Sequence, residues 1–156
     1  MNAHHHIRHA RASMGLSDRE VARRAELAVE KVTDIEDRAE AFIDAISIRA
    51  AFRLCTVLGV SIYQVLDVNT VPHPPRIPVA RYVGMIRRTA GLSQADLEEK
   101  IGCEKGFVQK VEEGGVDLLS FPTSLALGIS DSTQSSQFQM LNMLEQASET
   151  PKAKTP

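Results

Sequence analysis

The sequence predicts an all-α protein made of two similar helical domains in tandem, the second partly degenerate. Three observations support this fold class. Apolar residues recur at helical spacing through most of the 156 residues. A stretch that begins at Gly15 recurs without gaps from Gly91, always 76 positions later (91 minus 15), which indicates an internal duplication. A proline-rich segment between the copies marks a boundary between domains.

The first domain is expected to span residues 7–67 and to open with a helix that begins at Ile7 and stops at Gly15. Residues 1–6 are expected to fray. Four histidines lie near the start of the sequence: His4, His5, His6 and His9. Since no cysteine or carboxylate stands near them, we expect solvated side chains rather than metal ligands. No metal and no cofactor is predicted.

The rest of the first domain follows from its caps. Ser17 and Glu20 form the pattern of a full capping box, which starts a second helix. A third helix follows, with Ile35 on its apolar face. A later helix is expected to end at Gly59, and a short last helix to begin at Ser61. These elements predict a compact all-α domain.

Residues 68–78 contain four prolines and are expected to form an extended, semi-rigid linker. The second domain is expected over residues 79–148. Its central stretch has Ser93 at a helix N-cap, with the acid Asp96 three residues later. Gly102 stands where the chain must reverse into a left-handed conformation. The pattern predicts two short helices joined by a tight turn.

The second copy departs from the first after Gly114. Pro122 interrupts the helix expected there, and residues 130–136 have the composition of a polar loop. A final amphipathic helix is expected around Leu141, with core packing or dimerisation as its two interpretations. Residues 149–156 are expected to be a disordered tail.

Composition limits the function classes. No run of eighteen apolar residues exists, so no membrane span is predicted. The two cysteines have no metal-ligand spacing, which favours a reducing cytoplasm. No glycine-rich phosphate loop and no nucleophile with a placed base is present, so an enzyme is not expected. The net charge of −2 lacks the basic excess usual in DNA-binding domains, and charge must therefore be examined locally.

Matched positions carry a resemblance to a known family. In the first copy they are Arg11, Gly15, Leu16, Ser17, Val21, Ala22, Val32, Ile35, Glu36, Leu58, Gly59, Val60 and Ser61. In the second copy they are Arg87, Gly91, Leu92, Ser93, Gln94, Leu97, Gly102, Val108, Val111, Glu112 and Gly114. Both copies resemble the Cro/repressor-type (XRE-like) helix-turn-helix domains of phage repressors and bacterial regulators. The resemblance implies two five-helix-type domains and a sequence-specific DNA-binding transcriptional regulator, commonly a homodimer.

The resemblance also implies an ion pair in each copy. Arg11 with Glu36, and Arg87 with Glu112, keep the same 25-residue separation. In the family such a pair ties the first helix to the third, so its role is structural rather than DNA-contacting.

By resemblance, DNA bases are met by residues around the buried apolar residue of the third helix. In the second copy these base-contacting positions are Lys105, Gly106, Phe107, Gln109 and Lys110. Lysine and glutamine are common partners of guanine and adenine edges. Phe107 has two interpretations, contact with a thymine methyl group or packing. Gln94 matches the phosphate-contacting position, and Arg23, Arg24 and Arg88 are phosphate-contact candidates or part of a solvated basic face.

The corresponding positions of the first copy are Val29, Glu30, Lys31, Thr33 and Asp34. Glu30 and Asp34 make this helix acidic, which opposes approach to the phosphate backbone. Two hypotheses follow. The first is a regulator that binds double-stranded DNA through the second copy. The alternative is a protein-interaction module, antiactivator-like or antitoxin-like, whose acidic third helix in the first copy binds a protein partner.

Overall fold

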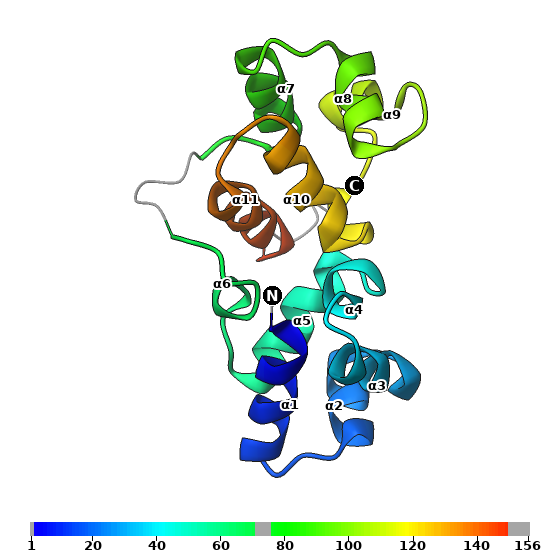
Figure 1. The fold of residues 1–156 in the computed structure, drawn as a ribbon, viewed down its shortest axis with the longest axis vertical. Helices are drawn as coiled ribbons and strands as arrows, with labels where there is room; N and C mark the ends of the chain where they lie inside the picture. Colours follow the sequence, from blue (N-terminus) through cyan, green and yellow to red (C-terminus); the bar gives the residue numbers. More distant parts are fainter. Residues whose placement is uncertain (1, 71–75, 150–156) are drawn as a thin grey trace, which may run out of the picture. The chain divides into compact units, whose positions relative to one another are not determined.

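The computed structural model describes residues 2–70 and 76–149. Within these ranges the chain is helical, with eleven α-helices, one 3-10 turn and a single isolated β-bridge but no strand. The all-α fold class predicted from the sequence is confirmed (Figure 1). Part of the expected linker, residues 71–75, and all of the expected tail but residue 149 lie outside the described residues.

The chain divides into two compact units. Unit 1 comprises Met1–Thr70 and Ser120–Ser124, and unit 2 comprises Val71–Leu119 and Leu125–Pro156. The short later segment groups with unit 1 because the backbone N–H of Ile48 donates to the carbonyl oxygen of Phe121 at 2.8 Å, beside the bridge between Ser47 and Pro122. The expected second domain ran unbroken over residues 79–148, and its sequence contains no signal for this excursion.

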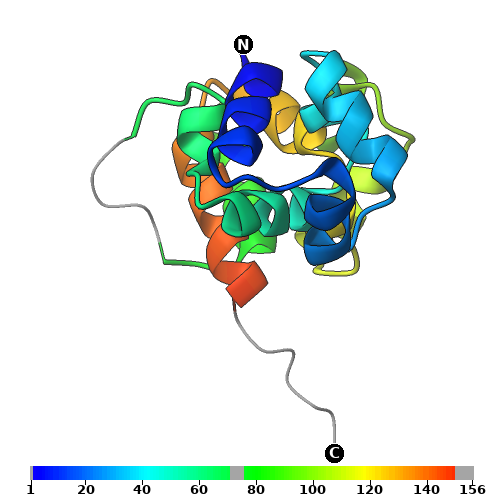
Figure 2. The same ribbon diagram turned by 90° about the horizontal axis from the view of Figure 1, so that it is seen from below.

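Unit 1 contains six helices, α1 (Ala3–Ser13), α2 (Asp18–Ala25), α3 (Val29–Asp37), α4 (Ala41–Asp44), α5 (Ile48–Leu58) and α6 (Ile62–Val65). Helix α2 packs against α3 and α5, and α6 lies beside α1 although the two are far apart in sequence (Figures 1 and 2). The predicted caps are present at Ser61, whose hydroxyl accepts from an amide of α6, and at Gly59, which ends α5 with φ 65°.

Two details of unit 1 differ from expectation. Helix α1 begins at Ala3 rather than Ile7, because Ala3 is fully buried and extends the apolar face of the helix. The capping box at Ser17 is only half formed. The Ser17 hydroxyl accepts from the backbone N–H of Glu20 at 3.1 Å, but the Glu20 carboxylate accepts from Arg23 and Arg24 instead.

Unit 2 contains α7 (Val79–Thr89), α8 (Gln94–Ile101), α9 (Phe107–Glu112), the 3-10 turn η1 (Leu118–Ser120), α10 (Thr123–Ser132) and α11 (Gln137–Glu149), with α10 starting in the segment that belongs to unit 1. Helix α10 continues to Ser132, so the polar loop expected over residues 130–136 is shorter than predicted. Ser130 is fully buried within α10, although its polarity indicated a loop, and the loop observed begins at Thr133.

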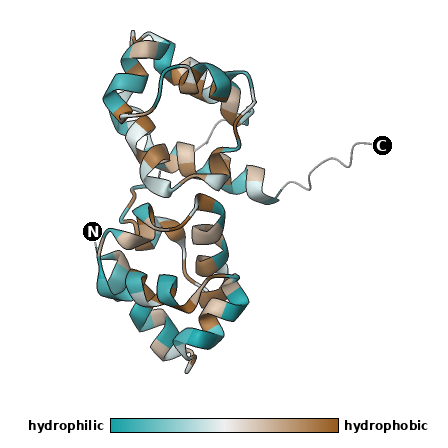
Figure 3. Cartoon of the chain, turned by 90° about the vertical axis from the view of Figure 1, so that its right-hand side faces the viewer, coloured by the Kyte–Doolittle hydropathy of each residue, from teal (hydrophilic) through white to brown (hydrophobic). Residues whose placement is uncertain are grey.

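Both units place their apolar side chains inside. Leu97, Val108 and Val111 are buried in unit 2, as Val32 and Ile35 are in unit 1. Figure 3 shows the apolar parts of the helices turned inward within each unit. Among the described residues, no helix is both long and apolar enough to cross a membrane.

The turn between the second and third helices has the same left-handed backbone in both units. Gly102 has φ 72° and Glu26 has φ 55° at the corresponding position. An ideal Cβ at Gly102 would meet no atom within 4 Å, so a substitution there is strained only by its backbone conformation.

We expect Gly102→Ala to lower the free energy of unfolding by about 1 kcal/mol, because a side chain disfavours positive φ. Gly115→Ala is the matched control, since Gly115 does not have a positive φ and an added Cβ would make only an ordinary contact, 3.5 Å from the Lys110 carbonyl oxygen. Urea denaturation followed by circular dichroism measures both. Equal losses for the two variants would contradict the assignment of the cost to backbone conformation.

Candidate nucleic-acid interface

Helix α8 begins with the predicted N-cap at Ser93. The Ser93 hydroxyl accepts from the backbone N–H of Asp96 at 3.0 Å, and the Asp96 carboxylate accepts from the backbone N–H of Ser93 at 3.1 Å. This full capping box lowers the pKa of Asp96, chiefly through the bond from the Ser93 backbone amide. Helix α8 ends at Gly102, and α9 then presents one face to the interior and one to solvent.

The outward face of α9 carries polar and basic side chains. Gln109 and Lys110 are exposed, whereas Phe107, Val108 and Val111 are buried. The Gln109 side-chain amide donates a hydrogen bond of 2.9 Å to the Glu113 carboxylate, one helical turn later on the same face. An exposed amide beside a lysine provides the donors that base edges and phosphates accept.

Two predicted base-contacting residues lie outside α9, and burial separates the two interpretations of a third. Lys105 and Gly106 precede α9 rather than forming its first turn, because the helix begins at Phe107. Lys105 is nevertheless exposed. Phe107 is 7% exposed, so packing is the interpretation that holds for its ring. The exposed set near the start of α9 is therefore Lys105, Gln109 and Lys110.

The predicted ion pairs are present in both units. In unit 1, Arg11 donates through Nε and Nη2 to the Glu36 carboxylate, the second at 3.0 Å. In unit 2, Arg87 donates to Glu112 at 2.7 and 3.4 Å. A third guanidinium nitrogen of each arginine donates to a backbone carbonyl in the following turn, at 3.0 Å in unit 1 and 2.8 Å in unit 2. The pairs tie α1 to α3 and α7 to α9.

Gln94, the predicted phosphate contact, is half-buried and its side-chain amide donates to the Glu112 carboxylate. This bond between α8 and α9 was not predicted, because Glu112 was assigned to the pair with Arg87. The amide nitrogen carries two N–H groups, so Gln94 can meet a phosphate with the second N–H or after exchanging this partner. Arg88, another predicted phosphate contact, is exposed and lines a shallow pocket of about 340 Å³ with Glu112 and Glu113.

The corresponding helix of unit 1, α3, has a different charge. Its exposed residues include Glu30, Lys31 and Thr33, while Val29 and Asp34 are half-buried. The Thr33 hydroxyl donates to the carbonyl oxygen of Val29 at 3.2 Å. Bonds from the Arg38 guanidinium hold the pKa of Asp34 below its ordinary value. Asp34 therefore stays ionised. It stands in α3 at the position that Lys110 has in α9, whereas Thr33 stands at the position of Gln109.

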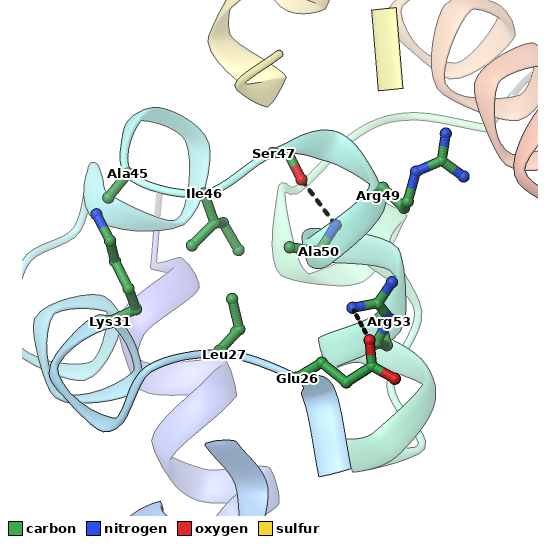
Figure 4. A pocket seen from close by; sticks show the side chains of 9 residues that line it. All are labelled: Glu26, Leu27, Lys31, Ala45, Ile46, Ser47, Arg49, Ala50 and Arg53. Carbon is green, nitrogen blue, oxygen red and sulfur yellow. Dashed lines mark hydrogen bonds and ion pairs between the residues drawn. The ribbon is translucent and has the colours of Figure 1, made fainter. Parts of the chain in front are cut away.

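A shallow pocket of about 430 Å³ lies in unit 1 beside the turn that precedes α3 (Figure 4). Leu27 and Ile46 line its centre, and Lys31 lies at one side. Glu26, the residue with the left-handed backbone, forms an ion pair with Arg53 at 3.0 Å. This contact offsets part of the conformational cost at the turn, and Glu26 and Arg53 neutralise each other at the edge of the pocket.

The arginines predicted to contact phosphate in unit 1 are paired. Arg23 Nη2 and Arg24 Nε donate to the Glu20 carboxylate at 2.6 and 2.8 Å. These bonds, from Arg23 first, lower the pKa of Glu20 to about 2. Both arginines are exposed, so the carboxylate competes with any phosphate for their donors.

The lowered pKa of Glu20 predicts a pH effect on stability. Because the folded-state pKa lies below the ordinary value, this contribution is present above about pH 4.5 and is lost as the pH falls towards 2. We expect Glu20→Gln to show a smaller fall in Tm between these pH values than the unchanged protein. Asp34 and Asp96 titrate in both proteins, so the difference isolates Glu20. Identical Tm profiles would contradict the pairing.

One interacting residue was missed by sequence reasoning. Glu98, on α8, is 6% exposed, and its Oε2 accepts from the backbone N–H of Val108 at 3.0 Å. The sequence signal was a charged residue at a position where the first copy has Ala22. Among the described residues, no three His, Cys, Asp or Glu side chains are grouped as metal ligands would be. Comparison with protein-family models, curated proteins and solved structures finds no match to this chain.

Proposed function

We propose that the protein is a sequence-specific, double-stranded DNA-binding regulator of transcription with two tandem helix-turn-helix domains. In this proposal α8 and α9 form the DNA-contacting helix-turn-helix, and α9 enters the major groove. The observation that carries the proposal is the outward face of α9, where Gln109 and Lys110 are exposed while the opposite face is buried. A helix presented in this way fits the groove width of duplex DNA.

Local geometry supports two copies of one motif. Each unit has a serine-capped second helix, a left-handed residue in the turn, and an arginine–glutamate pair that ties the first helix to the third. The acidic face of α3 makes unit 1 the weaker candidate for base contact. A cytoplasmic location is also part of the proposal and rests on the cysteine composition.

A selection from random duplexes at low salt tests the proposal. We expect enrichment of a defined sequence. We also expect the logarithm of the binding constant to fall linearly with the logarithm of the salt concentration, with a slope of about −0.9 for each phosphate contact. The stoichiometry of the selected complex shows whether one chain or a homodimer binds. Absence of enrichment and of any salt-dependent binding would contradict the proposal.

A second candidate function is favoured by the acids of α3, of which Glu30 is exposed and Asp34 is half-buried and bonded to Arg38. In this alternative, Glu30 and the neighbouring Asp34 contact a basic protein, and the helical scaffold serves an antiactivator-like or antitoxin-like interaction. A pull-down from a lysate of the native host should then recover one protein stoichiometrically, and Glu30→Lys should abolish its capture. Capture that is unaffected by Glu30→Lys would remove α3 from this interface.

A further inference from the structure

The start of α9 differs from the start of α3 through one hydrogen bond. In unit 1 the backbone N–H of Val32 donates to the carbonyl oxygen of Ala28 at 3.4 Å, which closes the first turn of α3. The corresponding amide of unit 2, that of Val108, donates instead to the Glu98 side chain at 3.0 Å. Ala22 occupies the position of Glu98 in unit 1 and offers no acceptor side chain.

The two helices consequently begin at different places. Helix α3 begins at Val29, whose counterpart in unit 2 is Lys105, yet α9 begins two residues later at Phe107. Gly106, directly before α9, has φ 88° and provides no side-chain cap. The Glu98 oxygen therefore does for α9 what an N-cap side chain does for most helices, but it reaches across from the preceding helix.

We propose that Glu98 is a positioning residue that fixes where α9 begins. Its carboxyl oxygen takes the Val108 amide that would otherwise bond to the Glu104 carbonyl, and so holds Lys105 in the turn before the helix. A buried polar group requires a partner, and Glu98 and the Val108 amide satisfy each other. The positioning role of Glu98 does not depend on the proposed function. Its consequence does: if α9 binds DNA, Glu98 determines which hydrogen-bond donors reach the DNA.

The burial of Glu98 and the left-handed conformation of Gly106 both act on the start of α9. Glu98 is 6% exposed and Val108 on α9 is essentially inaccessible to solvent, so the Glu98–Val108 bond is buried. A left-handed residue cannot continue an α-helix towards the N-terminus, and glycine accepts this conformation without steric cost. Glu98 and Gly106 together therefore define the shortened start of α9.

Nuclear magnetic resonance of the full chain tests the inference without DNA. In Glu98→Ala, we expect the Cα shift of Lys105 to become helical and Val108 to take the Glu104 carbonyl, as the corresponding residues do in unit 1. Glu98→Gln keeps an oxygen acceptor, so its Lys105 shift should stay non-helical. Glu99→Ala, at an exposed position of the same helix, is the matched control and should leave both signals unchanged.

If α9 of Glu98→Ala loses order at its start instead of extending to Lys105, the hydrogen-exchange rate of the Val108 amide still tests the inference. In that case the Val108 amide of Glu98→Ala should exchange at least tenfold faster, while Glu98→Gln stays within about threefold of the unchanged protein. The inference is overturned if Glu98→Ala leaves both the Lys105 shift and the Val108 exchange rate unchanged, or if Glu98→Gln alters them as much as Glu98→Ala does.

DNA binding separates this inference from the proposed function. With the selected duplex, Glu98→Ala should weaken binding about tenfold and change sequence preference, whereas Glu98→Gln and Glu99→Ala should not. If the unchanged protein binds no duplex but the resonance changes occur, the proposed function fails and the positioning role stands. If the duplex is bound and the resonance changes do not occur, the positioning role fails alone.

Discussion

Replacing Glu36 by alanine is expected to lower the free energy of unfolding of unit 1 by about 3 kcal/mol, because it leaves a partly buried guanidinium without its partner. The Glu36 side chain is 9% exposed and that of Arg11 is 23% exposed. Bonding to Glu36 raises the pKa of Arg11, and this effect is lost in the variant. Arg11 nevertheless remains charged there, because a guanidinium is protonated at neutral pH without any partner. The cost is therefore that of an uncompensated charge rather than of a surface pair.

Asp37→Ala is the matched control for this prediction. Asp37 lies next to Glu36 in sequence, and its carboxylate is 64% exposed and 3.5 Å from Arg8. An exposed pair contributes less than about 1 kcal/mol. Because the chain contains no tryptophan, urea denaturation should be followed by circular dichroism, with hydrogen exchange assigning the transition to unit 1. A loss for Glu36→Ala no larger than that for Asp37→Ala would contradict the structural role of the pair.

The double substitution of Lys105→Ala and Lys110→Ala is expected to weaken DNA binding about 100-fold at low salt, at about 1.4 kcal/mol for each lysine. Both side chains are exposed, so the far-ultraviolet spectrum and Tm should change little. The salt dependence identifies the contact. Loss of a phosphate contact reduces the logarithmic salt slope by about 0.9, whereas loss of a base contact leaves the slope and relaxes the sequence preference.

Lys100→Ala controls for loss of charge alone. Lys100 is an exposed lysine of the same unit, on α8 rather than α9. We expect this variant to lose no more than a few-fold in affinity and to keep the preferred sequence. If Lys100→Ala weakened binding as much as the double variant, general electrostatic attraction would explain the result, and α9 would lose its assigned role.

Much of the fold was predictable because it depends on residues that are close in sequence. The hydroxyl of Ser93 and the carboxylate of Asp96 are one helical turn apart, so their capping box follows from spacing alone. The left-handed turn at Gly102 follows from the freedom of glycine at positive φ. The Arg11–Glu36 pair was expected from the family resemblance, at a separation that recurs in both copies, and the structure confirms it.

The details that were missed involve competition between partners. The Glu20 carboxylate accepts hydrogen bonds from two arginines rather than from the backbone N–H of Ser17, its partner in a full capping box. Likewise, the Val108 amide bonds to Glu98 rather than to the preceding turn of its own helix, which moves the start of α9. The first outcome is a competition between partners within α2, which spacing alone does not decide. The second depends on the distance between α8 and α9, which the pattern of one sequence does not contain.

The most direct test of the proposed interface is a nuclear magnetic resonance titration of the full chain with the duplex enriched by selection. We expect the largest shift changes at Lys105, Gln109 and Lys110, with a further change at Gln94 as its amide leaves Glu112 for a phosphate. Residues of α3 such as Glu30 should change little. Changes confined to α3, or no saturable change in either helix, would contradict DNA binding through α9.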